Sequence, residues 1–219
     1  GIEVRAYTKA IGNIVIPENE YDFSCISQNS LQMPNQAYAL RAAEYLEECM
    51  KNQDSSGGII ECSITGLPVG IGEPVFEKLD ANLAKAIMSI GAVKGVEIGD
   101  GFHAASANGS SNNDPFRTAS GGHDIQKAPN HSGGTLGGMS DGSTLILRAA
   151  VKPTPSISRV QQTVNTSGDE IELSIHGRHD PVIVPRAVVV VESMAALTLI
   201  DMLLINMSAK LENIIEFYK

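Results

Sequence analysis

The sequence contains no tryptophan, and tyrosine and phenylalanine occur only five times each. With so few aromatic residues, the core must be filled by valine, isoleucine, leucine and alanine. Apolar residues still make up 42% of the chain and charged residues 19%, which is ordinary for a soluble globular protein. A chain of 219 residues can build a sizeable core in one domain or in two small ones.

Cysteine is also scarce. Cys25, Cys49 and Cys62 are odd in number and form no short-spaced pair. Metal-binding cysteines normally come in such pairs, so we expect reduced thiols and no metal site. Reduced thiols are typical of the cytosol, and no secretory or transit signal is recognisable at the start of the chain. We therefore expect a cytoplasmic protein.

Positive charge is in short supply, because 16 lysines and arginines stand against 25 aspartates and glutamates, giving a net charge of −9. An acidic surface disfavours nucleic acid and anionic membranes as partners, and any anionic ligand needs local positive charge. The most hydrophobic run, residues 182–207, contains Arg186, Glu192 and Asp201. Those charges favour a buried helix over a membrane span.

Hydrophobic periodicity and turn residues predict strands and helices in mixed succession. Helices are expected over residues 35–52, 79–90, 185–207 and 210–218, and strands over 2–16 (one or two strands), 58–64, 93–98, 145–151, 161–164 and 171–175. The elements do not alternate regularly, which favours the α+β class. In the first helix the expected apolar stripe is Ala39, Ala43, Leu46 and Met50. The helix at 187–207 is apolar nearly all round, so we expect it to be buried on several sides.

Residues 103–134 differ in composition from the rest of the chain. They are rich in alanine, serine, asparagine and glycine, and Phe116 is almost their only bulky apolar residue. Loops this long are uncommon inside a compact domain unless they are functional lids or disordered. We expect a mobile active-site loop over residues 103–134.

The segment Gly177–Pro181 places a guanidinium, an imidazole and a carboxylate next to one another. In an extended chain His176, Arg178 and Asp180 share one face, and Pro181 favours an extended backbone at the residue before it. Such a cluster suits an anionic ligand and proton transfer. The alternative is a surface turn with a weak ion pair.

Two further segments could contact a ligand. The glycine pairs at 133–134 and 137–138 allow a close approach of backbone and expose amide donors, although a glycine-rich turn has the same composition. In residues 152–156, two prolines stiffen the chain and leave hydroxyls and a lysine available, which suits a phosphate or flavin. The alternative for this segment is a stiffened strand exit.

Together these segments resemble the chorismate synthase family. The resemblance is carried by Asn130–Gly142, Lys152–Ser158 and Gly177–Pro181, in that order, and continues through Gly66–Phe76 and Lys94–Phe102. It covers nearly the whole chain. The resemblance implies an α+β fold with helices sandwiched between antiparallel sheets, one core domain over residues 1–219, and a homotetramer.

The family is a group of carbon–oxygen lyases of the shikimate pathway of aromatic amino acid biosynthesis. They remove phosphate from 5-enolpyruvylshikimate 3-phosphate by a 1,4-anti elimination to give chorismate. They require reduced FMN (FMNH2), without net redox change, and NADP is associated with the family. The resemblance therefore implies this substrate and this cofactor, and no nucleic acid or membrane partner.

Site residues follow from the same resemblance. The implied FMN contacts are Gly91, Ala92, Gly137, Lys152, Pro153, Thr154, Pro155, Ser156 and Arg178. Asp180 resembles the catalytic aspartate, which acts on proton transfer at flavin N5. Many members have asparagine where Gly91 stands, so only a backbone contact is expected there. For three other polar residues we expect structural roles: Arg186 at a helix start, His131 as a solvated loop residue and Asp100 as a turn former.

Two family motifs have no counterpart in the sequence. Neither a Gly-x-Ser-His-Gly motif nor an Arg-Glu-Thr motif occurs, and these carry catalytic histidines and substrate-binding arginines in the family. The chain resembles the C-terminal three-fifths or so of chorismate synthase. Two alternatives to an active enzyme therefore stay open: a truncated, catalytically inactive oligomerisation core, and a flavin-binding module of another activity.

Overall fold

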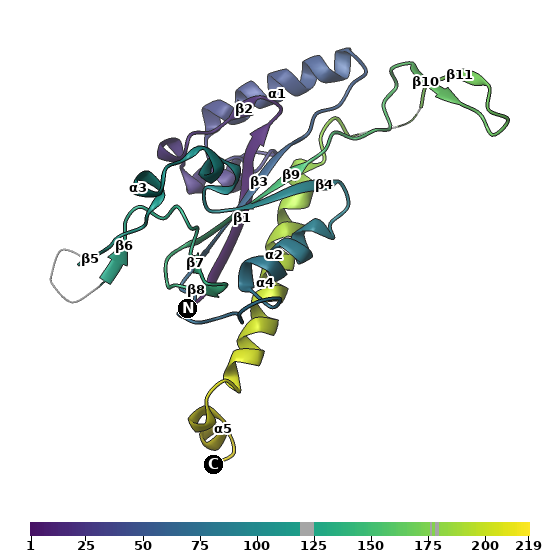
Figure 1. Ribbon diagram of the computed structural model, residues 1–219. Helices are drawn as coiled ribbons and strands as arrows, with labels where there is room; N and C mark the ends of the chain where they lie inside the picture. The colour runs from purple at the N-terminus through teal and green to yellow at the C-terminus, as the bar shows by residue number, and fades with distance from the viewer. Residues whose placement is uncertain (119–124, 176, 178–179) are drawn as a thin grey trace. The chain divides into compact units, whose positions relative to one another are not determined.

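The structure, a computed structural model, describes residues 1–118, 125–175, 177 and 180–219. Its largest element is a five-stranded sheet with the strand order β2-β1-β3-β9-β4 (Figure 1). The strands are β1 (Glu3–Ile11), β2 (Ile14–Val15), β3 (Gly58–Thr65), β9 (Leu145–Val151) and β4 (Val93–Ile98). Helices and antiparallel strand pairs in mixed order confirm the predicted α+β class.

The remaining elements are four longer helices, several single turns and three hairpins. The longer helices are α1 (Gln36–Lys51), α2 (Leu79–Met88), α4 (Val184–Met207) and α5 (Leu211–Phe217). The short helical turns are η1 (Glu18–Glu20), η2 (Phe23–Gln28), η3 (Gly101–Ser106) and α3 (Gly109–Asn112). The hairpins pair β5 (Phe116–Thr118) with β6 (Ile125–Lys127), β7 (Thr135–Leu136) with β8 (Met139–Ser140), and β10 (Gln161–Val164) with β11 (Glu170–Leu173).

Packing divides the chain into two compact units. Unit 1 comprises Gly1–Ala6, Glu61–Ala149 and Val189–Lys219, and unit 2 comprises Tyr7–Ile60 and Ala150–Val188. Strands β1, β3 and β9 and helix α4 contribute residues to both units. One domain over residues 1–219 stays a prediction.

Helix α1 begins at a clear capping signal and buries one stripe. The Asn35 side chain accepts hydrogen bonds from the amides of Ala37 and Tyr38, which satisfies two of the free donors at the helix start. The buried residues are Ala39, Ala42, Leu46 and Cys49. The prediction of Ala43 and Met50 in this stripe was wrong, since both are exposed. The apolar residues of α1 cover a wide face of the helix. Packing buries the edge of that face with Ala42 and Cys49 and leaves the edge with Ala43 and Met50 exposed.

Helix α4 buries only one side in this chain. Apart from Pro185, its buried residues recur every three or four positions, at Val184, Val188, Val191, Ala195, Leu199 and Met202. Leu197 and Leu204, on another side, are each 62% exposed. Burial on several sides is therefore not achieved within this chain. The helix is long and apolar enough to cross a membrane, but the core helix of a soluble protein meets the same criteria.

Strand β3 shows the predicted alternation of side chains, and it also buries one glutamate. Ile60, Cys62 and Ile64 are fully buried, as expected. Glu61, on the opposite face, is buried as well, because its carboxylate lies 3.1 Å from the Arg148 guanidinium. Burial, together with the nearby Glu192 carboxylate, raises the pKa of the Cys62 thiol to about 12. This thiol is therefore protonated and inert at neutral pH.

Candidate functional site

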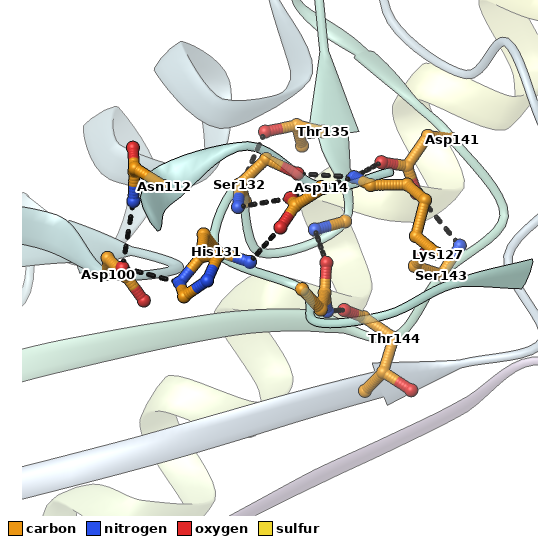
Figure 2. Close-up of polar contacts among 12 residues, drawn as sticks. Asp100, Asn112, Asp114, Lys127, His131, Ser132, Thr135, Asp141, Ser143 and Thr144 are labelled. Atoms are coloured by element: carbon orange, nitrogen blue, oxygen red, sulfur yellow. Dashed lines mark hydrogen bonds and ion pairs between the residues drawn. The ribbon is translucent and has the colours of Figure 1, made fainter. Parts of the chain in front are cut away.

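A dense polar network occupies residues 100–144 of unit 1 (Figure 2). The region predicted as a long loop contains η3, α3 and the β5–β6 hairpin, in which Phe116 pairs with Lys127. Figure 2 shows Asp114 and Ser132 between the Asp100–His131 pair and Lys127. Mobility of residues 103–134 stays a prediction.

Lys127, at the end of β6, is the centre of the network. Its Nζ lies 2.5 Å from Asp141 Oδ2 and 3.3 Å from Asp114 Oδ2, and it also donates to the Ser132 hydroxyl. The Lys127 side chain is only 1% exposed and the two carboxylates are each 6% exposed. Buried charges are tolerated only when they are paired and hydrogen-bonded, and here one ammonium satisfies three partners. We call Lys127, Asp114 and Asp141 the lysine clasp.

The carboxylates of the lysine clasp are ionised. Burial alone would raise the pKa of Asp114, but the amides of Ser132 and His131, the Ser132 hydroxyl and Lys127 outweigh it and lower that pKa to about 2. Burial likewise opposes ionisation of Asp141, and hydrogen bonds from Lys127 and Ser143 lower its pKa. Both carboxylates therefore carry their charge at neutral pH.

Next to the clasp, an imidazole and a carboxylate form a second pair. His131 Nδ1 lies 2.7 Å from Asp100 Oδ2, which also accepts a hydrogen bond from the Asn112 side chain at 3.0 Å. The His131 side chain is 26% exposed, and its amide donates to Asp114. The expectation of a solvated loop histidine was wrong. Asp100 does begin a turn, η3, but it also orients this imidazole.

The first glycine pair serves a backbone crossing. A methyl group at Gly133 would lie 2.3 Å from the amide nitrogen of Gly99, so the two backbone segments are in contact there. The Asp100 amide donates to the His131 carbonyl at 2.8 Å beside this crossing. Gly133 and Gly134 lie in a turn, as the glycine-rich alternative predicted, and Gly133 in addition packs against the backbone at Gly99, which was not predicted.

The second glycine pair forms the turn of the β7–β8 hairpin. Leu136 pairs with Met139, so Gly137 and Gly138 are the two turn residues, and both have positive φ angles. Gly138 is packed: its carbonyl accepts from the Leu79 amide at 2.8 Å. At Gly137, by contrast, an added methyl group would have no neighbour within 4 Å among the residues described. Gly137 therefore has room for the ligand contact predicted at this position.

Gly91 and Ala92 form the turn between α2 and β4. Helix α2 ends at Met88, two residues before the predicted end. Ala92 has φ +72°, a left-handed conformation that costs energy in a residue with a Cβ. The Gly137–Gly138 turn lies at the start of α2, whereas Gly91 and Ala92 lie beyond its end, and a helix of 10 residues is about 15 Å long. The FMN contact predicted at Gly137 therefore lies apart from those predicted at Gly91 and Ala92.

In unit 2, the segment Lys152–Ser156 offers donors and an unsatisfied hydroxyl. Lys152 is exposed, and the Thr154 carbonyl accepts from the Ser55 hydroxyl at 2.7 Å. The Thr154 hydroxyl oxygen is buried and has no hydrogen-bond partner among the described residues. Buried polar groups normally have partners, so this orphan hydroxyl fits a site that a flavin or phosphate completes.

Asp180 lines a pocket of about 180 Å³. Its other lining residues are Met50, Gln53, Asp54, Ser55, Ile157, Ser158, Gly177 and Pro181. The Asp180 carboxylate lies 2.7 Å from Arg186 Nη1, with the side chains 38% and 76% exposed respectively. The predicted neighbours His176, Arg178 and His179 lie outside the described residues, and so does the predicted FMN contact of Arg178. Arg186, expected to be structural, is the observed partner of Asp180.

Sequence reasoning missed the segment that joins the predicted parts of unit 2. The Ser56 amide donates to the Pro181 carbonyl at 2.7 Å, and the Ser55 hydroxyl binds the Thr154 carbonyl. A methyl group at Gly57 would lie 2.5 Å from the Val151 carbonyl, so this backbone also needs glycine. Residues 55–57 therefore bring Lys152–Ser156 and Asp180 into one neighbourhood. The only signal in the sequence is the run of small residues Ser55–Gly58, which follows the helix predicted over residues 35–52.

No three histidine, cysteine, aspartate or glutamate side chains gather as metal ligands would in the part of the chain that the structure describes.

Comparison with known proteins gives one consistent result. A family model described as chorismate synthase matches residues 1–204. The chorismate synthases of Agathobacter rectalis and Lachnoclostridium phytofermentans are 63% and 59% identical to the chain over 219 residues. A crystal structure of chorismate synthase matches with a TM-score of 0.76 and 28% identity, over 95% of this chain and 58% of that chain. The chain covers 59% of the length of the two relatives.

Proposed function

The chain belongs to the chorismate synthase family, and we propose that it contributes the FMN- and Asp180-bearing part of an enzyme that makes chorismate. The substrate is 5-enolpyruvylshikimate 3-phosphate, from which phosphate and a ring hydrogen are eliminated without net redox change. The observation that supports this most is the neighbourhood of Asp180, Ser55 and Thr154, which has a pocket and an unsatisfied hydroxyl.

Each predicted part has a physical task. Reduced FMN, when bound, supplies an electron transiently and recovers it. Thr154 offers a hydroxyl without a partner among the described residues, and Lys152 offers positive charge to a phosphate in a chain whose net charge is −9. Gly137 allows a close backbone approach. Asp180 holds or moves a proton at flavin N5, a role that geometry favours because the carboxylate borders the pocket.

We further propose that residues 103–134 cover the site and exclude water when both ligands are bound. Limited proteolysis tests this proposal. Cleavage within residues 103–134 should slow when reduced FMN and 5-enolpyruvylshikimate 3-phosphate are present together, and not with either alone. An unchanged cleavage rate would remove the lid from the proposal.

The second candidate is a truncated, inactive oligomerisation core of the same enzyme. It is favoured by the exposed apolar side of α4, which includes Leu197 and Leu204. Apolar helix faces of this kind are normally covered by protein. A homotetramer in the cytoplasm is part of both proposals. Light scattering of the purified chain measures the oligomeric state.

An anaerobic assay separates the two candidates. The chain is mixed with chemically reduced FMN and 5-enolpyruvylshikimate 3-phosphate, and chorismate is followed by absorbance. Turnover that Asp180→Ala abolishes and that Asp169→Ala, an exposed aspartate in the turn between β10 and β11, preserves would establish an active site in this chain. Absence of turnover, with activity appearing when the remaining segment of the Agathobacter rectalis relative is added, would establish the inactive core. Absence in both cases would reject the proposed reaction.

A further inference from the structure

We propose that Lys127 is a positioning residue, which holds the Gly137–Gly138 turn in place through the lysine clasp. The inference rests on the proposed function in one respect, namely that Gly137 contacts FMN. The hairpin itself is short: only Thr135–Ser140 and Leu136–Met139 pair along it. An isolated hairpin of this size is not stable in water, so its turn needs anchors from outside.

The clasp holds both ends of the hairpin. Ser132, three residues before β7, binds Lys127 through its hydroxyl. Asp141, which directly follows β8, binds the same ammonium at 2.5 Å. The Asp141 amide also donates to the Gly134 carbonyl at 3.1 Å, so the two ends are joined to each other as well. One buried side chain therefore fixes the entry and the exit of the turn.

Asp114 fixes the lysine from the other side. Its two oxygens accept the amides of His131 and Ser132 at 2.8 and 2.9 Å, and Oδ2 also lies 3.3 Å from Lys127 Nζ. The lysine is thus held between a carboxylate that is itself anchored to the chain before β7 and a carboxylate that follows β8. The ion pairs of Lys127 with Asp114 and Asp141 are buried and shielded from water. They therefore restrict the movement of the β7–β8 hairpin.

The hairpin has further anchors at its turn and at the end of β8, on the side away from the clasp residues that precede β7. The Ser140 hydroxyl accepts the Ile71 amide at 2.9 Å, and the Gly138 carbonyl accepts the Leu79 amide. Without Lys127, two ionised carboxylates would face each other in a buried space and move apart. We expect the chain ends around the hairpin to separate, while β8 stays attached to the segment at Ile71.

The experiment compares Lys127→Met with Lys127→Arg, which keeps the charge, and with Lys85→Met, an exposed lysine of α2 in the same unit. Two quantities are measured on the full 219-residue chain: hydrogen exchange of the amides of residues 134–141, and the Kd for FMN from flavin fluorescence. Far-UV circular dichroism checks folding. If Lys127→Met does not fold, the double variant Lys127→Met with Asp141→Asn, which removes one of the opposed charges, takes its place.

We expect Lys127→Met to accelerate exchange in the hairpin at least 10-fold and to weaken FMN binding by a similar factor. Lys127→Arg, which keeps the charge but is bulkier, should give values between those of Lys127→Met and the unaltered chain, and Lys85→Met should change neither. Unchanged exchange would overturn the clasp. Faster exchange with an unchanged FMN Kd would overturn the positioning role. Faster exchange in a chain whose unaltered form does not bind FMN would reject the proposed cofactor while supporting the clasp.

Discussion

The lysine clasp and the Asp180 pocket use the same kinds of side chain in opposite ways. In the clasp one ammonium and two carboxylates are nearly inaccessible, and every oxygen named above has an amide, hydroxyl or ammonium partner. At the pocket, Asp180 and Arg186 form one ion pair that solvent reaches, and the Thr154 hydroxyl has no partner among the described residues. Saturated polar networks fix a structure, whereas accessible and incomplete ones leave groups available to a ligand.

This comparison separates stability from function. Groups that are fully paired with protein have nothing left to offer a substrate, so the most elaborate polar network of unit 1 is not where we expect chemistry. The plainer site in unit 2 has a pocket, a partly exposed carboxylate, and a buried hydroxyl that has no hydrogen-bond partner among the described residues. Substitutions in the two regions should therefore differ in what they damage.

The largest effect is expected from Lys127→Met. Removing one partner of a buried ion pair leaves uncompensated charge and typically costs about 3–5 kcal/mol. We expect the free energy of unfolding, measured in urea, to fall by about that amount. The matched control is Lys85→Met, which should stay within about 0.5 kcal/mol, as exposed substitutions do. A loss below about 1 kcal/mol for Lys127→Met would mean that the clasp is no more stabilising than a surface pair.

A somewhat smaller effect is expected from a methyl group at Gly133. Gly133 and Gly137 have similar φ angles, +65° and +61°, but only Gly133 touches another backbone. We expect Gly133→Ala to cost about 2–4 kcal/mol of unfolding free energy, from the clash with Gly99 and the left-handed conformation. Gly137→Ala should cost only about 1 kcal/mol, since the left-handed backbone conformation is the single unfavourable contribution there. Equal losses would show that the turn at Gly137 is as tightly packed as the crossing.

Local features of the chain were predictable from its sequence, because their signals lie within a few residues. The bounds of β4, β9 and β10 agree with the prediction, since alternating side chains and flanking breakers define short strands. The family was recognised from ordered glycine- and proline-rich segments, and the α+β class was predicted from the irregular succession of strands and helices. The site residues within those segments stay predictions, apart from the geometric support described for Gly137, Thr154 and Asp180.

The polar pairings could not be predicted, because they join residues far apart in the sequence. Lys127 and Asp141 are 14 residues apart, and Asp100 and His131 are 31 apart, with no shared periodicity. His131 was therefore interpreted as solvated, and Asp100 only as a turn former. The role of Ser55 in binding the Thr154 carbonyl is of the same kind, since 99 residues separate the two. Only the folded chain decides which polar residues meet.

Acid should weaken the clasp once the pH falls below the ordinary pKa of an aspartate. The pKa of Asp114, about 2 in the folded state, lies below its ordinary value of 3.8, so its stabilisation is fully present above about pH 4. It is lost as pH falls from about 4 toward 2, and the shift corresponds to about 2 kcal/mol. We expect the unfolding free energy to fall by that amount in this window. In Asp114→Asn this part of the acid sensitivity should be missing, and an unchanged pH profile would contradict the assignment.

The smallest effect is expected from Arg186→Met at the pocket. Exposed ion pairs contribute about 0–1 kcal/mol and are screened by salt, so the loss in unfolding free energy should stay below about 1 kcal/mol and vanish near 1 M salt. Arg159, whose guanidinium lies 3.7 Å from Asp54 on the same pocket, provides the matched control, and Arg159→Met should behave alike. The buried clasp, in contrast, should respond little to salt. A loss above about 2 kcal/mol for Arg186→Met, insensitive to salt, would show that Asp180 is held as rigidly as the clasp carboxylates, and the contrast between the two regions would fail.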